Sequence, residues 1–319
     1  MSHIAKNIEN LVGNTPLLRL ERLATGLGAE LLAKIEWFNP SGSDKDRVVL
    51  AMLEAAEADG RLTPETVIIE PTSGNIAFSL AMLAVPRGYR VILVMPDGLP
   101  GWRVHLLRAM GAEVVQSPAA YGMVGARSRA DALADSYSSV FQISQFANPA
   151  NPAAHHKTAD EIWQSCDGNV AAVVASVATG GTITGIGRRL KALSKGKVQI
   201  VAVESSASPV LSGGSAGYHQ LFGMTPPFVP DNYDPTIVDE VIGVSDNQCH
   251  DMLLALYRLE GLMSGPAGGA AIVAALQLAS RAELAGQRIV AIVPDRMDRY
   301  SGLRFWDNFK VLIPNVVKE

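Results

Sequence analysis

The chain of 319 residues has few cysteines, few aromatic side chains and no long run of like charge. Cys166 and Cys249 are far apart and form no CxxC pair, which argues against a disulfide framework or a thiolate zinc site and is typical of a reducing compartment. The net charge is only −4, without five consecutive like charges, so nothing indicates a nucleic-acid or basic membrane surface. No apolar stretch reaches about 18 residues, and the N-terminus lacks an apolar signal core. We therefore expect a cytoplasmic protein without metal, nucleic-acid or membrane partners.

What the chain does contain is 48% apolar residues, arranged in two alternating patterns. Short β-branched runs, mostly apolar on both faces, predict strands of a covered parallel sheet, and longer segments at helical spacing predict the helices between them. This alternation predicts a doubly wound α/β fold, in which ligands bind in the loops at the carboxyl ends of strands. Residues 208–233, rich in Gly, Pro and Ser, predict a long ordered loop. The expected strands are 31–35, 66–70, 91–95, 171–176, 199–204 and 288–293. The expected helices are 44–58, 75–87, 103–110, 126–136, 181–193, 246–260 and 269–280.

One loop places a lysine at the start of a predicted helix. Residues 39–47, NPSGSDKDR, follow a strand, and Ser43 or Asp44 is the expected N-cap. Lys45 then falls in the first turn, where the positive end of the helix dipole disfavours a cationic side chain. This position suits an amine that must react unprotonated, although an ordinary exposed lysine is the alternative.

Two further loops offer groups for a carboxylate and for a phosphate. Residues 70–75, EPTSGN, present two hydroxyls, an amide and backbone N–H groups at a helix start, which suits a carboxylate as well as an ordinary capping role. Residues 178–182, ATGGT, can form an anion nest, and they are neither a Walker loop nor a dinucleotide fingerprint. A lysine at one strand end and a phosphate cradle at another together suit pyridoxal 5′-phosphate, which needs both.

Four motifs give the chain a resemblance to a known family. The blocks NPSGSDKDR, EPTSGN, QFANP (145–149) and TGGT (179–182) occur in an order and spacing that resembles the cysteine synthase (O-acetylserine sulfhydrylase) and cystathionine β-synthase family, fold type II pyridoxal-phosphate enzymes. The resemblance extends from residue 11 to residue 300. It implies two doubly wound α/β lobes of the tryptophan synthase β-like architecture. The smaller, mobile lobe (46–148) would carry the carboxylate loop, and the larger lobe (1–45 and 149–319) would carry the phosphate cradle.

The resemblance also implies a reaction and roles for single residues. Lys45 would be the Schiff-base lysine and the acid–base group at the substrate Cα. The reaction would be β-replacement, in which a nucleophile such as sulfide takes the place of the leaving group on Cβ of an activated serine. An amino-acid substrate, a homodimer and a serine acetyltransferase partner are also implied. Asn75 and Ala267 would contact the cofactor ring, Ala178, Thr179, Gly180, Gly181 and Thr182 its phosphate, Thr72, Ser73 and Gln145 the substrate carboxylate, and Gly223 the region of the substrate amine.

Several positions near this implied site depart from the family pattern. Ile76 stands where a threonine is usual, and Ala267 replaces a serine whose hydroxyl would meet the pyridine nitrogen of the cofactor. That nitrogen is then either left to water or paired with Asp295. Because Asp295 follows a proline at a strand end, we expect it to face solvent and the nitrogen to lack a partner. We also expect His155 and His156 to be surface or capping residues.

These departures leave three interpretations open. The first is a cysteine synthase acting on O-acetylserine. The second is a specialised synthase that uses O-phosphoserine or a nucleophile other than sulfide, of the diaminopropionate-precursor or cyanoalanine type. The third is a cysteine-synthase-like protein that binds a partner without catalysis, against which the intact Lys45 counts.

Overall fold

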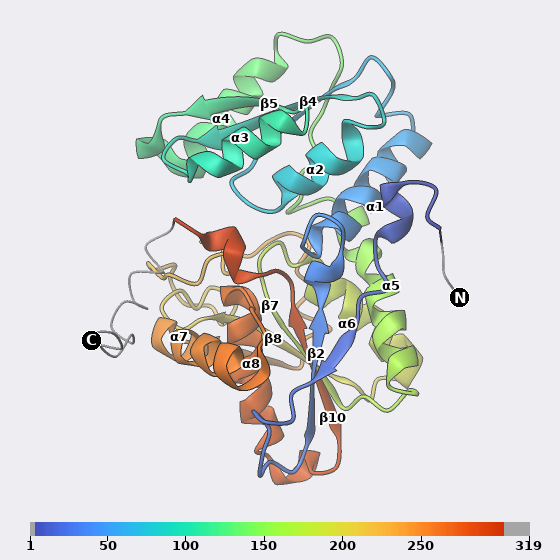
Figure 1. The fold of residues 1–319 in the computed structure, drawn as a ribbon, viewed down its shortest axis with the longest axis vertical. Coiled ribbons are helices and arrows are strands. Elements are labelled where there is room, and N and C mark those ends of the chain that lie inside the picture. The colour runs from blue at the N-terminus through green and yellow to red at the C-terminus, as the bar shows by residue number, and fades with distance from the viewer. Residues whose placement is uncertain (1–3, 303–319) are drawn as a thin grey trace, which may run out of the picture.

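Two β-sheets organise residues 4–302, the part of the chain that the computed structural model describes (Figure 1). The six-stranded sheet has the order β1-β2-β10-β7-β8-β9, with β1 antiparallel to β2 and all other pairs parallel. The four-stranded sheet, β5-β4-β3-β6, is parallel throughout. The strands are β1 (Leu17–Arg19), β2 (Glu30–Ile35), β3 (Val67–Pro71), β4 (Arg90–Pro96), β5 (Glu113–Ser117), β6 (Val140–Phe141), β7 (Ala172–Ser176), β8 (Gln199–Ser205), β9 (Glu240–Val244) and β10 (Arg288–Val293). The α-helices are α1 (Lys45–Ala58), α2 (Ile76–Ala84), α3 (Gly101–Ala109), α4 (Gly122–Ala134), α5 (Ala150–Ser165), α6 (Gly181–Ser194), α7 (Asp246–Ala255) and α8 (Pro266–Ala279).

Helices cover both faces of the six-stranded sheet. Successive side chains of a strand point to opposite faces, and these strands are apolar on both, so both faces must be buried. Leu31 and Ala33 of β2 join the core beneath α7 and α8, whereas Leu32 joins the core beneath α5 and α6. Figure 1 shows α7 and α8 on one side of this sheet and α5 and α6 on the other. Burial on both faces explains why the strands lack polar alternation.

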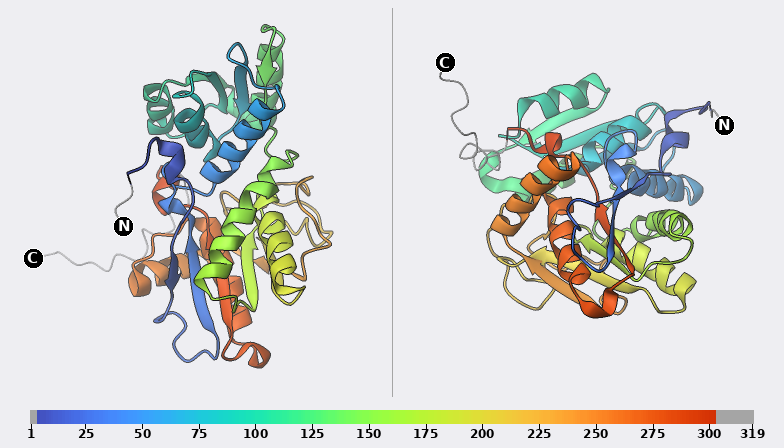
Figure 2. Two further views of the ribbon diagram at one scale, coloured as in Figure 1. Left: turned by 90° about the vertical axis from the view of Figure 1, so that its right-hand side faces the viewer. Right: turned by 60° about the horizontal axis from the view of Figure 1, so that its bottom comes forward.

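The four-stranded sheet forms the second lobe by the same rule. Ile68 of β3 packs in a core with α1, α2 and α3, and the next residue, Ile69, packs on the other face with α4. Helix α1 contacts α2 of this lobe and α5 of the other, so it runs between the two sheets (Figures 1 and 2).

The predicted doubly wound α/β architecture is confirmed, and all six predicted strands lie within one residue of their predicted bounds. The prediction was incomplete at β1, β5, β6, β9 and α5. The predicted helix 246–260 is α-helical only to Ala255 and continues as a π-helical segment, Leu256–Glu260. Residues 208–233 contain no helix or strand, as expected, and Phe222 packs on the large core while Tyr218 is 85% exposed.

Candidate active site

Loops from both lobes meet at the carboxyl ends of β2, β3, β7 and β10. The Asp44 N–H donates to the Pro294 carbonyl over 3.0 Å, and Ser43 forms an isolated β-bridge with Asp295, which joins the loops after β2 and β10. The Asn75 side chain reaches the same place from the small lobe. Topology thus brings together segments that are more than 200 residues apart, at the edge where α/β folds bind their ligands.

Lys45 is the first residue of α1, and its side chain is 14% exposed. Its Nζ donates to Asp44 Oδ1 over 2.7 Å, and the other oxygen, Asp44 Oδ2, accepts from Thr182 Oγ1 over 3.2 Å. The buried Asp44 carboxylate therefore links the candidate Schiff-base lysine to the candidate phosphate cradle. Asp44 sits at the N-cap position as expected, but its side chain makes no capping bond, because it is engaged with these two residues.

The cradle lies between β7 and α6, and its shape depends on two glycines. Gly180 has φ of 80°, and a Cβ there would lie 2.6 Å from the backbone nitrogen of Tyr233. A Cβ on Gly181 would collide with Asn151 Oδ1, a buried acceptor that has no hydrogen-bond partner among residues 4–302. Ala178 does not have a positive φ, so the alanine at the start of the cradle causes no backbone strain.

His155 is completely buried behind this cradle, and the expectation of a surface histidine is wrong. Its Nε2 lies 3.2 Å from Thr182 Oγ1, and its Nδ1 lies 3.2 Å from Thr158 Oγ1. Burial lowers the pKa of the His155 imidazole to about 4, so the ring is neutral near pH 7. Positions 155, 158, 159 and 162 share the buried face of α5, but only Ala159 and Ile162 among them are apolar, so the helical pattern does not reveal this burial. His156 is exposed, as expected.

The candidate carboxylate loop lies between β3 and α2. Thr72 is buried, and its Oγ1 accepts from the Gly74 N–H over 3.3 Å. The Ser73 carbonyl accepts from Arg103 Nη1 over 2.6 Å, so the arginine on α3 fixes the loop. Ile76, in contrast, packs in the small-lobe core. Its side chain has no hydroxyl, so it cannot add a hydrogen bond to the carboxylate loop.

Gln145 is held at the junction of the lobes. Its backbone carbonyl accepts from Asn151 Nδ2 over 2.7 Å and from Asn232 Nδ2 over 2.8 Å. Glu70, at the end of β3, accepts from the Ile143 N–H over 3.2 Å. Burial raises the pKa of this carboxyl to about 8. Glu70 therefore connects the strand before the carboxylate loop to the segment that carries Gln145.

Asp295 does not face solvent, and that expectation is wrong: it is only 2% exposed. Its Oδ2 accepts from Asn75 Nδ2 over 2.7 Å and from the Tyr300 hydroxyl over 2.6 Å. Burial raises the pKa of the Asp295 carboxyl to about 6. A Cβ on Gly223 would lie 2.7 Å from the Tyr300 hydroxyl, so this residue, implied near the substrate amine, lies beside the same group. Ala267, also buried, lies in the first turn of α8, where its carbonyl accepts from Ser176 Oγ over 2.6 Å.

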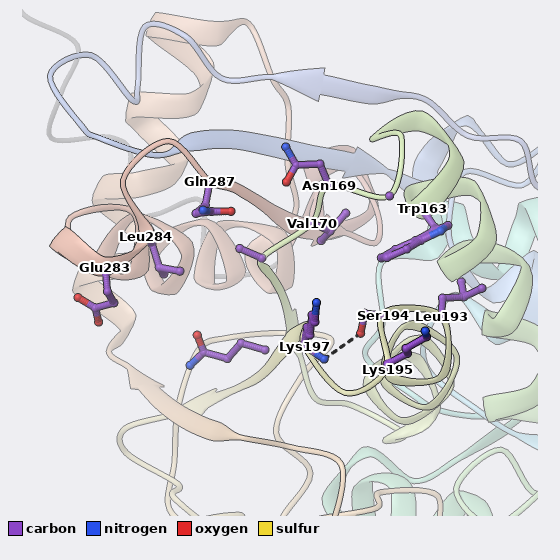
Figure 3. Close-up of a pocket in the computed structure, with 13 residues that line it drawn as sticks. Trp163, Asn169, Val170, Leu193, Ser194, Lys195, Lys197, Glu283, Leu284 and Gln287 are labelled. Atoms are coloured by element: carbon purple, nitrogen blue, oxygen red, sulfur yellow. Dashed lines mark hydrogen bonds between the residues drawn. The ribbon is translucent and has the colours of Figure 1, made fainter.

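A separate cavity of about 620 Å³ opens at the opposite edge of the large sheet (Figure 3). Trp163, Val170, Lys195, Lys197 and Leu284 are among the residues that line it, where β7, β8 and β10 begin. None of the candidate site residues belongs to this cavity. It lies away from the strand ends at which parallel sheets bind their ligands, so we do not assign the chemistry to it.

Within residues 4–302 no group of three His, Cys, Asp or Glu side chains could hold a metal ion. The helices of the same residues include none that is long and apolar enough to cross a membrane.

The family model for pyridoxal-phosphate dependent enzymes matches residues 8–295. The chain belongs to this family. It is 43% identical over 310 residues to a probable cysteine synthase of Bacillus subtilis, and the aligned region covers 96% of this chain and 99% of the relative. A cysteine synthase of Staphylococcus aureus is 39% identical over 92% of this chain and 94% of its own length. The solved structure of the cysteine synthase of Entamoeba histolytica matches with a TM-score of 0.93 and 37% identity, covering 99% of this chain and 93% of that one.

These comparisons confirm the resemblance to cysteine synthases, the fold type II architecture and pyridoxal phosphate as the cofactor. The geometry of this pyridoxal-phosphate enzyme fits that group. Gly180 and Gly181 let the cradle pack against Tyr233 and Asn151 where a Cβ would collide, and a helix N-terminus with nearby hydroxyls favours a phosphate. Lys45, on the adjacent loop, has an amine that could bind the cofactor aldehyde.

Proposed function

We propose that this enzyme catalyses β-replacement on O-acetylserine, with sulfide as the nucleophile and cysteine and acetate as the products. The observation that carries the proposal is the connection of Lys45 to Thr182 through Asp44, which puts the reactive amine beside the phosphate cradle in a chain related throughout to cysteine synthases. The relatives named above favour cysteine formation over the specialised and the non-catalytic alternatives.

Each group of site residues has its own role in the proposed reaction. Residues 178–182 would hold the cofactor phosphate, and Asn75 its phenolic oxygen. Thr72, Ser73 and Gln145 would bind the substrate carboxylate. Lys45 would take the proton from the substrate Cα and return it, because its amine lies on the loop beside the cradle and is linked to it through Asp44. The bound cofactor supplies an electron-withdrawing ring that stabilises negative charge on Cα.

We also propose that residues 46–148 close as a mobile lobe over the bound substrate. The carboxylate loop lies in this lobe and the phosphate cradle in the other, so closure would bring substrate and cofactor groups together and exclude water. Gly223, beside Tyr300, would cover the substrate amine from the loop 206–239.

We further propose a homodimer in the cytoplasm, with a serine acetyltransferase as a partner, on the basis of the family resemblance. Cys166 and Cys249 are both buried free thiols, which is consistent with a reducing compartment. Light scattering of the pure protein, alone and mixed with a serine acetyltransferase, tests the assembly.

The activity is tested by measuring cysteine formation from O-acetylserine and sulfide. We expect turnover by the wild type and a loss of at least a thousandfold in Lys45→Ala, whereas Lys157→Ala, an exposed lysine on α5, should match the wild type. Activity in Lys45→Ala within tenfold of wild type, a barrier change of only about 1.4 kcal/mol, would refute the role of Lys45. Turnover with O-phosphoserine or cyanide but not with O-acetylserine and sulfide would support the specialised alternative instead.

A further inference from the structure

Asp295 carries one buried carboxylate oxygen that nothing in the described chain satisfies. Asn75 and Tyr300 both donate to Oδ2, whereas Oδ1 has no hydrogen-bond partner among residues 4–302 and is inaccessible to solvent. Buried polar atoms are nearly always paired, and leaving one unpaired costs about 1–3 kcal/mol. This orphaned acceptor indicates a donor outside residues 4–302.

The surroundings of Oδ1 hold the carboxylate in a fixed position. A Cβ on Gly265 would collide with Oδ1, so only a glycine at this N-cap lets the carboxylate approach the start of α8. The positive end of that helix favours a carboxylate. The two donors on Oδ2 prevent the group from rotating. The Asp295 carboxylate is therefore an acceptor whose orientation is fixed by contacts with Asn75, Tyr300 and Gly265.

The location of Oδ1 restricts what the missing donor can be. Asp295 is bonded to Asn75, the residue proposed for the cofactor's phenolic oxygen, and contacts Gly265, which precedes Ala267 by two residues at the N-cap of α8. Among the groups of pyridoxal phosphate, the phosphate is anionic, the methyl group is apolar and the phenolic oxygen belongs to Asn75. The nitrogen joined to the cofactor aldehyde carbon is held at Lys45, so the ring nitrogen, when protonated, is the donor left for Oδ1, and a cation is also the species that a carboxylate prefers.

We propose that Asp295 Oδ1 accepts a hydrogen bond from the protonated ring nitrogen of the cofactor. Asp295 thus supplies the hydrogen-bond acceptor for the ring nitrogen that the methyl group of Ala267 cannot supply. This inference rests on the proposed cofactor site and reverses the expectation that the nitrogen lacks a partner. A nitrogen that keeps its proton withdraws electrons from Cα more strongly than a neutral ring, so the chain would favour proton removal from Cα.

The test is the nitrogen-15 resonance of the ring in protein reconstituted with labelled pyridoxal phosphate. We expect the chemical shift of a protonated pyridine in the wild type at pH 7.5, and that of an unprotonated pyridine in Asp295→Asn, whose amide carries no charge. Asp298→Asn is the matched control, because Asp298 is a half-exposed acid on the same loop that pairs with Arg296. It should keep the wild-type shift.

An unprotonated nitrogen in the wild type would overturn the proposal without any variant, as would a protonated nitrogen that persists in Asp295→Asn. If Asp295→Asn fails to fold with cofactor, Asp295→Ser, with a neutral hydroxyl, carries the same prediction. The visible absorbance of the bound cofactor separates this inference from the proposed function. A wild type that binds no cofactor contradicts both, whereas a coloured, active wild type with an unprotonated ring contradicts only the role of Asp295.

Discussion

At the scale of single residues, the cradle needs a glycine at position 180 for two reasons. The backbone there is left-handed, and it also approaches Tyr233 closely. Gly180 and Gly196 lie just before and just after α6, and their φ angles are 80° and 81°. A Cβ on Gly196 would meet nothing within 4 Å, but one on Gly180 would press on the backbone of Tyr233. Alanine substitutions at these two glycines therefore distinguish the effect of backbone strain from the effect of displacing the cradle.

We predict that Gly180→Ala and Gly196→Ala differ in cofactor affinity. Both pay roughly 1–2 kcal/mol for alanine in the left-handed region, which should lower the free energy of unfolding in each variant. Only Gly180→Ala must also move the loop away from Tyr233, so its dissociation constant for pyridoxal phosphate should rise at least tenfold. Fluorescence titration of the two cofactor-free variants checks this, and equal affinities would contradict the assigned cradle.

Sequence reasoning found the loops that carry these residues, but it could not predict their burial. The NPSGSDKDR and TGGT blocks indicated an amine and a phosphate site, and the structure places Lys45 and Thr182 on either side of Asp44. Asp295 and His155 were misjudged because the residues that enclose them, Tyr300 and Thr182 among others, come from other elements. Burial of a polar residue is set by tertiary contacts that no local pattern encodes.

At the scale of elements, Glu70 couples the end of β3 to the segment after β6. Its carboxyl accepts from the Ile143 N–H inside the protein, only two residues before Gln145. The pKa of Glu70 is raised to about 8, above its usual value of 4.5, so the folded protein holds this proton at neutral pH whereas the unfolded chain releases it. Protonation of one side chain therefore supports the alignment of two loops.

We predict that Glu70 makes stability fall as pH rises from about 5 to about 8. In this range the folded state binds one proton more than the unfolded state, so unfolding becomes easier with increasing pH. Glu70→Gln keeps an acceptor for the Ile143 N–H and cannot ionise, so its melting temperature should decline less over this range. Differential scanning calorimetry of both proteins provides the comparison, and parallel pH profiles would show that the pKa of Glu70 is the same in the folded and unfolded states.

The elements themselves were predictable where the pattern is long and apolar. The six predicted strands are buried, and their β-branched runs are bounded by turns. Strand β6 has only two residues, and β9 contains an exposed glycine, Gly243, so neither gives a strand signal. Helix α5 begins with Ala-Asn-Pro, which is also typical of a turn, and polar residues such as His155 and Thr158 interrupt the apolar spacing of its buried face.

At the scale of the whole molecule, Arg103 ties the two lobes together beside the site. Its guanidinium donates to the Ser73 carbonyl in the small lobe and to the Arg299 carbonyl after β10, and the side chain is buried. Together with the bond from Asn75 to Asp295, it joins the carboxylate loop to the large lobe in this conformation. The proposed closure of the lobe must therefore shift these two contacts or take place around them.

We predict that Arg103→Ala raises KM for the amino-acid substrate at least tenfold, with a smaller change in kcat. Loss of the tether leaves the Ser73 carbonyl unpaired and the carboxylate loop less ordered, which weakens binding more than chemistry. Arg108→Ala, an exposed arginine of the same helix, should behave like the wild type. Steady-state kinetics decide the matter: a fall in kcat with unchanged KM would mean that Arg103 acts on the reacting groups and not on the loop.

The central claim, that the site between the lobes holds pyridoxal phosphate on Lys45, is tested most directly by reductive trapping. The pure protein is incubated with pyridoxal phosphate, treated with borohydride and mapped by peptide mass spectrometry. We predict one modified peptide with the cofactor's mass fixed on Lys45, and no label there in Lys45→Ala. A protein that gains no label, or whose label lies on a lysine outside this site such as Lys195 or Lys197, would contradict the account.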